Sequence, residues 1–186
     1  MKRLIDILLA ILLAICLFIP LGVIAIIIAI SSRGPVIYWS DRVGRENLIF
    51  RMPKFRTMRL ETPEYATHLL EKPEQLVTPI GAILRRSSLD ELPQLWSILK
   101  GDMSFVGPRP ALFNQDDLIA LRTEKGIHKL IPGLTGLAQI NGRDDIIIEV
   151  KVELDERYMR EQSLLLDLKI LIATLNRVIF RIGVSH

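Results

Sequence analysis

Two adjacent carboxylates, Asp90 and Glu91, lie in a stretch where several residue types could handle phosphate. Arg85 and Arg86 come just before them, and Arg109 follows at the centre of a Pro-Arg-Pro segment. Because proline fixes its own φ angle, an arginine in so stiff a loop suits a planar, bidentate partner such as phosphate. A carboxylate among such cations is expected to stay ionised. It could then act as a nucleophile or hold a hard cation such as Mg²⁺.

The same stretch also has a structural interpretation. Proline is tolerated only in the first turn of a helix, so Pro93 predicts a helix with Asp90 as its N-cap, an interaction worth about 1 kcal/mol. A capping box from Ser88 to Glu91 would place the proline too deep, and we discount it. The helix start would also favour an anion nearby. Capping and catalysis both remain open on these residues alone.

Apolar positions after the carboxylates predict how this helix continues. Leu92, Leu95, Trp96 and Leu99 recur at helical spacing, and Gly101 follows. The pattern predicts a helix that buries one face and ends at the glycine.

Residues 7–30 form an uncharged apolar run that, as one helix, would be about 36 Å long and could cross a bilayer. No convincing signal-peptide cleavage site follows it, so we expect it in the mature protein. Pro20 interrupts the run, and cationic residues flank both of its ends, so the positive-inside rule selects no orientation. Two arrangements remain open: a spanning helix, or one that breaks near Pro20 and returns to the same side.

Composition narrows the function classes. The net charge of +3 is too small to indicate nucleic-acid binding by bulk electrostatics. Cys16 is the single cysteine, which excludes an intramolecular disulfide, and the three histidines lack the spacing of zinc ligands. The length fits one domain with an appendage.

Two further patterns predict local structure. Two β-rich runs, 36–39 and 48–52, with turn residues between them predict a β-hairpin. Apolar positions in residues 164–182 recur at helical spacing and are interrupted by Lys169, Arg177 and Arg181. This helix could lie at an anionic membrane surface or pack on the core, and both interpretations stay open.

Six segments along the chain form a recognisable series: Lys2-Arg3 with Asp6, KFRTM at 54–58, LRRSSLDELPQLW at 84–96, KGDMSFVGPRP at 100–110, PGLTGLAQINGR at 132–143 and LDLKI at 166–170. In this order they resemble the bacterial sugar transferase family, the monotopic phosphoglycosyl transferases, over nearly the whole chain.

With the hairpin, the resemblance implies a mainly α-helical α+β chain. Residues 1–33 would form a re-entrant membrane helix, and residues 34–186 a compact catalytic domain with interfacial amphipathic helices. The family breaks its membrane helix at a Ser-Pro pair, and here the pair is Ile19-Pro20. The protein would lie on the cytoplasmic face of the bacterial inner membrane, in contact with the phospholipid bilayer.

The resemblance also implies a reaction. A sugar-1-phosphate would pass from a UDP-sugar to polyprenol (undecaprenyl) phosphate with release of UMP, as the first membrane step of a glycoconjugate pathway. Asp90 would be the nucleophile, forming a covalent aspartyl phosphosugar, and a ligand of Mg²⁺. Glu91 would assist the attack by the lipid phosphate. Four arginines would bind phosphate and nucleotide: Arg56, Arg85, Arg109 and Arg143.

Two other functions are compatible with the same residues. A membrane-attached, metal-dependent phosphodiesterase or pyrophosphatase would use the Asp-Glu pair with water in place of the lipid phosphate. A non-catalytic scaffold would use the basic residues only to hold anionic lipid. No residue indicates which sugar is transferred, and the oligomeric state is not predicted.

Overall fold

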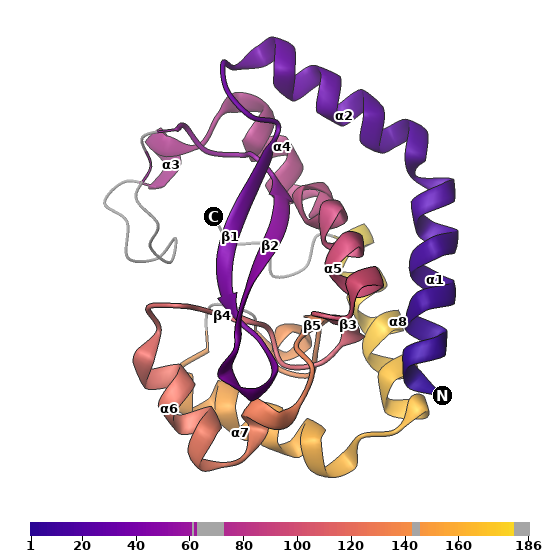
Figure 1. Cartoon of the computed structure of the whole chain (residues 1–186), viewed down its shortest axis with the longest axis vertical. Coiled ribbons are helices and arrows are strands. Elements are labelled where there is room, and N and C mark those ends of the chain that lie inside the picture. The colour runs from indigo at the N-terminus through magenta and orange to yellow at the C-terminus, as the bar shows by residue number, and fades with distance from the viewer. Residues whose placement is uncertain (61, 63–72, 143–145, 181–186) are drawn as a thin grey trace.

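The computed structural model describes residues 1–60, 62, 73–142 and 146–180, and this part of the chain is mainly helical with small sheets (Figure 1). With η denoting a 3₁₀-helix, the elements are α1 (Lys2–Cys16), α2 (Phe18–Ser31), β1 (Ile37–Val43), η1 (Arg45–Asn47), β2 (Ile49–Phe55), α3 (Pro73–Leu76), α4 (Pro79–Arg86), η3 (Leu89–Gln94), α5 (Leu95–Lys100), β3 (Ser104–Val106), β4 (Ala111–Leu112), α6 (Asp116–Glu124), η4 (Ile127–Lys129), β5 (Gly133–Thr135), η5 (Gln139–Asn141), α7 (Ile148–Glu161) and α8 (Leu164–Phe180). The prediction of a mainly α-helical α+β chain is confirmed.

The predicted hairpin is present, and its strands are longer than the sequence indicated. β1 and β2 pair antiparallel, from Ile37 opposite Phe55 to Val43 opposite Ile49, and the hairpin runs through the middle of the molecule (Figure 1). The short strand β4 pairs with the other edge of β1, while β3 pairs parallel with β5. The pairing with β4 places that strand at the tip of the hairpin, whereas β3 and β5 form a separate small sheet.

The N-terminal apolar run forms two helices with a 62° bend between them. The break lies at Leu17, and Pro20 occupies the first turn of α2, where its missing N–H costs little. Within the described residues, no single helix is long and apolar enough to cross a bilayer, whereas α1 and α2 together have the length and composition for it. The break therefore lies near the predicted proline, and membrane insertion stays a prediction.

Both N-terminal helices pack against the remainder of the chain. On α1, Ala10 is fully buried in a core cluster with Ile98 and Phe105, and on α2, Ile28 packs in a second cluster with Phe55 and Leu84. The opposite faces of both helices expose large apolar side chains: Leu4, Leu8, Leu12, Ile15, Phe18, Ile19, Val23, Ile26 and Ile30. The helices thus have one face on the protein core and one apolar face without cover from the described residues.

The helix predicted to begin at Asp90 begins later. Residues 89–94 form the 3₁₀-helix η3, with Ser88 before it in the left-handed conformation at φ 55°, and the α-helix α5 begins at Leu95. The prediction of Asp90 as an α-helical N-cap is therefore wrong, because Pro93 precedes the α-helix instead of lying in its first turn. The predicted end is correct, since Gly101 closes α5 with a left-handed φ of 106°. Trp96, expected on the buried face, is 59% exposed.

Helix α8 lies where the sequence predicts a C-terminal helix, although residues 181 and 182 fall outside the described residues. Ile170 is fully buried in the core cluster that contains Ala10. The other face of α8 exposes Leu165, Leu168, Ile172 and Leu175. The helix therefore packs on the core with one face and keeps an apolar surface on the other.

Candidate active site

Asp90 and Glu91 lie in η3, which packs against β2 of the hairpin. The Asp90 residue is only 8% exposed, and the Glu91 side chain is also largely buried. Because a 3₁₀-helix has three residues per turn, adjacent side chains leave it about 120° apart. The two carboxyl groups therefore meet different surroundings despite being neighbours in sequence.

Glu91 is held by two cations from separate elements. Its Oε1 atom accepts hydrogen bonds from Nζ of Lys54 on β2 at 2.9 Å and from Nη2 of Arg109 at 2.8 Å. Burial alone would raise the pKa of the Glu91 carboxyl, but these two charge-assisted contacts outweigh it and hold the pKa well below its usual range. Glu91 is thus ionised throughout the physiological range.

The pKa of Asp90 shifts in the opposite direction to that of Glu91. Burial raises its pKa above the ordinary value, the neighbouring Glu91 charge adds to the increase, and Lys54, Arg85 and Arg109 oppose it. None of the hydrogen bonds among the described residues ends on the Asp90 carboxylate. The cations expected to favour the charge of Asp90 are bonded to other groups, which is why burial prevails.

The four predicted phosphate-binding arginines have different surroundings. Arg109 reaches Glu91, and Arg85 lies close enough to influence Asp90 while it donates to Oγ1 of Thr57 at 3.0 Å. Arg56 is instead bonded at the end of α2, donating to the carbonyl oxygens of Ser32 and Arg33 at 3.0 and 2.8 Å. Arg143 lies outside the described residues. The structure therefore brings Arg85 and Arg109, but not Arg56, to the two carboxylates.

Lys54 is the residue of this site that the sequence analysis missed. It alternates with Phe50 and Met52 on the inward face of β2, and burial lowers the pKa of its ammonium group. The β-rich run predicted from the sequence ends at residue 52, before Lys54. The alternation of Phe50, Met52 and Lys54 is the signal that could have extended the strand and placed a lysine on its buried face, which is rare unless the lysine is paired.

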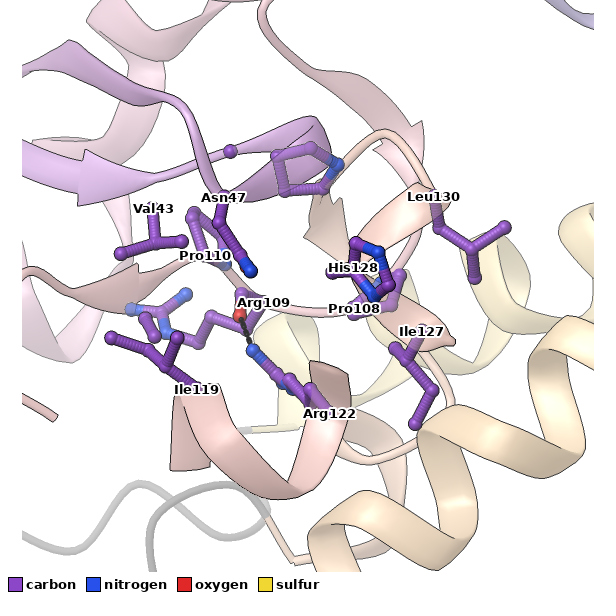
Figure 2. Close-up of a pocket in the computed structure, with 13 residues that line it drawn as sticks. Val43, Asn47, Pro108, Arg109, Pro110, Ile119, Arg122, Ile127, His128 and Leu130 are labelled. Carbon is purple, nitrogen blue, oxygen red and sulfur yellow. Dashed lines mark hydrogen bonds between the residues drawn. The ribbon is translucent and has the colours of Figure 1, made fainter. Parts of the chain in front are cut away.

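A pocket lies beside the backbone of Arg109, between the hairpin tip and helix α6 (Figure 2). Its lining residues are Val43, Gly44, Asn47, Pro108, Arg109, Pro110, Ala111, Ile119, Arg122, Ile127, His128, Leu130 and Pro132. Figure 2 shows the guanidinium of Arg122 donating to the main-chain carbonyl of Arg109, at 2.8 Å. Arg122 in turn is paired with Asp155 on α7. Neither partner of this ion pair was predicted, because nothing local in the sequence links positions 33 residues apart.

Among the described residues, Asp90 is the side chain placed to hold Mg²⁺ together with a substrate. In the described residues, no three or more carboxylate, histidine or cysteine side chains gather as a metal cage. However, protein Mg²⁺ sites that act on phosphates commonly use one or two carboxylates together with phosphate oxygens and water. Asp90, whose carboxylate has no hydrogen-bond donor among the described residues, suits that role.

A buried acid next to an ionised, doubly paired acid is an arrangement compatible with covalent or metal-assisted phosphate chemistry. The sequence profile of the family described as "Bacterial sugar transferase" matches residues 1–181. The chain therefore belongs to this family, and the resemblance found in the sequence is confirmed.

Known relatives support the same assignment. The chain is 40% identical to a Bacillus subtilis (strain 168) protein named uncharacterized sugar transferase EpsL, with 100% of this chain and 91% of the relative covered. It is 38% identical to an undecaprenyl-phosphate glucose phosphotransferase of Komagataeibacter xylinus, over 96% of this chain but 36% of the relative. It is also 38% identical to the UDP-glucose:undecaprenyl-phosphate glucose-1-phosphate transferase of Escherichia coli (strain K12), over 94% of this chain and 39% of the relative. The chain thus spans little more than a third of the length of the last two.

Proposed function

We propose that the protein transfers a sugar-1-phosphate from a UDP-sugar to undecaprenyl phosphate or a similar polyprenol phosphate, as the first membrane step of a bacterial glycoconjugate pathway. The observation that carries the proposal is the contrast between Asp90, buried without a hydrogen-bond donor among the described residues, and Glu91, bonded to Lys54 and Arg109. The names of the relatives from Komagataeibacter xylinus and Escherichia coli support the reaction class.

The reaction proceeds in two displacements. In the first, a carboxylate oxygen of Asp90 forms a bond to the phosphorus that carries the sugar, and the bond from that phosphorus to UMP breaks. In the second, an oxygen of the lipid phosphate attacks the same phosphorus, and the bond to Asp90 breaks. The products are UMP and a polyprenol diphosphate sugar. Splitting one displacement into two lets two bulky phosphates react in turn at one side chain.

The surrounding charges serve these displacements. Arg109 and Lys54 face Glu91 and can stabilise negative charge on the transferring phosphoryl group, as fixed cations do in other phosphoryl transfers. Arg85 adds positive charge near Asp90. A Mg²⁺ ion bound by Asp90 and the diphosphate would supply further charge neutralisation. Glu91, ionised and fixed, assists the approach of the lipid phosphate in the second step.

Contacts at the two ends of the bent helix pair support a re-entrant N-terminal segment. At the start of α1, Lys2 pairs with Asp167 of α8 at 2.6 Å, and Arg3 donates to the carbonyl of Ile98 at 2.5 Å. Directly after α2, Arg56 of the globular part donates to the carbonyls of Ser32 and Arg33. Because both ends of the bent pair contact the same globular part, both belong on one side of a bilayer. We place residues 1–33 in the cytoplasmic leaflet of the inner membrane and residues 34–186 at its cytoplasmic face.

The test uses purified protein in lipid nanodiscs with Mg²⁺, undecaprenyl phosphate and a panel of UDP-sugars. We expect multiple-turnover UMP release that depends on undecaprenyl phosphate. Without the lipid acceptor we expect at most one UMP per protein, together with an intact-mass increase by one phosphosugar that maps to Asp90. Asp90→Asn should abolish both signals while the protein remains folded. Continued release of UMP or sugar phosphate beyond one equivalent per protein without lipid acceptor would instead indicate a phosphodiesterase or pyrophosphatase. Lipid binding without turnover would indicate a scaffold.

A further inference from the structure

The three carbonyl groups of the Pro108-Arg109-Pro110 segment accept hydrogen bonds from three different parts of the fold. In the order of the segment, the donors are Gly133 N, Arg122 Nη1 and Arg42 Nη1, at 2.9, 2.8 and 3.3 Å. The two prolines have no N–H, so the carbonyl oxygens are the main backbone groups through which hydrogen bonds can fix this segment. The place of the Arg109 side chain therefore depends on these donors.

The donor on the central carbonyl belongs to a buried ion pair. Nε and Nη2 of Arg122 donate to Oδ2 of Asp155 at 3.0 and 2.5 Å, and the side chains of the two residues are 9% and 1% exposed. The donors of a guanidinium form a planar fork of fixed geometry. Pairing one edge of Arg122 with Asp155 therefore aims the remaining Nη1 at the carbonyl of Arg109. Figure 2 shows this contact between Arg122 and Arg109.

We propose that Arg122, oriented by Asp155, is a positioning residue that fixes Arg109 where the diphosphate of the nucleotide sugar binds. The inference rests on the proposed function. It follows a continuous series of contacts from Asp155 on α7 through Arg122 on α6 and Arg109 to Glu91 in η3. Arg122 makes no hydrogen bond to Asp90 or Glu91, so its effect on the reaction must pass through Arg109.

Replacing Arg122 with lysine separates the effect of the planar guanidinium geometry from the effect of the positive charge. An ammonium group is a compact point charge and cannot reproduce a planar fork that serves two acceptors in fixed directions. Arg122→Lys keeps a cation beside the buried Asp155 but loses the directed contact with Arg109. The matched control is Arg157→Lys on α7, where the side chain is 63% exposed and pairs with Glu161.

The test is a double-mutant cycle between positions 122 and 109, measured with the most active UDP-sugar of the panel. We expect Arg122→Lys to lower kcat/KM for the UDP-sugar by about 10- to 100-fold, the scale of a misplaced binding group. KM for undecaprenyl phosphate should stay close to wild type. Because the buried pair with Asp155 is weakened, the melting temperature should fall, and activity is therefore measured well below it. In an Arg109→Ala background the same substitution should have little effect, because the group it positions is gone. Equal fold losses in both backgrounds would overturn the proposal.

A binding measurement tests the inference without turnover. Calorimetry with inorganic pyrophosphate and Mg²⁺, on protein in nanodiscs, should show weaker binding in Arg109→Ala and in Arg122→Lys, and no change in Arg157→Lys. Wild-type binding that does not depend on Arg109, or that Arg122→Lys leaves intact, would overturn the positioning role. Absence of lipid-dependent UMP release would refute the proposed function alone, and the pyrophosphate measurement would still decide the role of Arg122.

Discussion

Nζ of Lys54 lies 2.9 Å from Oε1 of Glu91, and the same oxygen accepts a hydrogen bond from Arg109 at 2.8 Å. One carboxylate oxygen thus holds together a β-strand, a 3₁₀-helix and a stiff loop. Because both cations bond to Glu91 rather than to Asp90, the two adjacent acids have pKa values that move apart. Such divergence between neighbouring acids commonly marks a division of catalytic roles.

Replacing Lys54 should change both the rate and its pH dependence. Lys54 makes the largest contribution among the charges that lower the pKa of Asp90, so Lys54→Met should raise that pKa further. In the proposed mechanism Asp90 must be ionised to attack, so the acid limb of the kcat/KM profile should move to higher pH. We expect kcat at pH 7 to fall by about 100-fold, as when one electrostatic donor is removed from an active site.

The matched control is Lys100→Met, because this lysine is 58% exposed and pairs only with Asp102 among the described residues. It should leave the profile unchanged. An acid limb that stays in place in Lys54→Met would show that Asp90 does not set it.

The opposite pKa shifts predict opposite effects on stability. The folded-state pKa of Asp90 is raised, so ionising this group opposes folding, and stability falls as pH rises through that pKa. Asp90→Asn should therefore raise the melting temperature at pH 7, with a gain that shrinks as pH falls toward the ordinary aspartate value near 3.8.

For Glu91, ionisation has the opposite effect on stability and favours folding. Its folded-state pKa is depressed, so it contributes stability above the ordinary glutamate value of 4.5 and loses it as pH falls below that value. Glu91→Gln leaves the largely buried Lys54 ammonium and the partly exposed Arg109 guanidinium without their shared anion, which should lower the stability at pH 7 by about 2 kcal/mol. Thermal melts of both variants between pH 4 and pH 8 test the pair, and shifts of the same sign at pH 7 would contradict the assignment.

The sequence predicted those elements whose form depends on residue periodicity and on the backbone preferences of single residues. The hairpin and α8 have the periodicity of their secondary structure, and Gly101 ends α5 because glycine accepts a left-handed φ. The start of that helix was wrong because an intervening 3₁₀ turn, entered from Ser88 in the left-handed conformation, moved Pro93 out of the α-helix.

Tertiary contacts explain the rest of the difference at the site. Asp90, Glu91, Arg85 and Arg109 carry chemistry that can be recognised from residue type and spacing. Lys54 joins them only because β2 packs on η3, and Arg122 meets Asp155 only because α6 packs on α7. Chemistry can thus be predicted from residue types, whereas partners distant in sequence require the fold.

Gly133 should tolerate no side chain. A methyl group there would lie 2.1 Å from the backbone nitrogen of Gly107 and 2.5 Å from the carbonyl oxygen of Thr135, closer than atoms can approach. Gly133→Ala must therefore separate β3 from β5 and displace the loop that carries Arg109. We expect a loss of at least about 3 kcal/mol, comparable to severe overpacking, measured as a lower melting temperature. Gly22→Ala is the control, because its methyl would meet nothing within 4 Å. Similar melting temperatures for the two variants would contradict the predicted clash.

The re-entrant arrangement predicts which cysteines a membrane-impermeant maleimide can reach. The experiment uses a Cys16→Ser background with one new cysteine in each protein: inserted after Met1, at Arg33, at Ile19 or at Glu161. Since Lys2 and the end of α2 both contact the globular part, the cysteines near Met1 and at Arg33 and Glu161 should all be labelled in inside-out vesicles and protected in spheroplasts. Ile19, beside the break and 75% exposed, should be labelled only after detergent is added, because the proposed arrangement places it in lipid. A cysteine near Met1 that reacts in intact spheroplasts would place that end outside the cell and contradict the re-entrant arrangement that the ion pair between Lys2 and Asp167 supports.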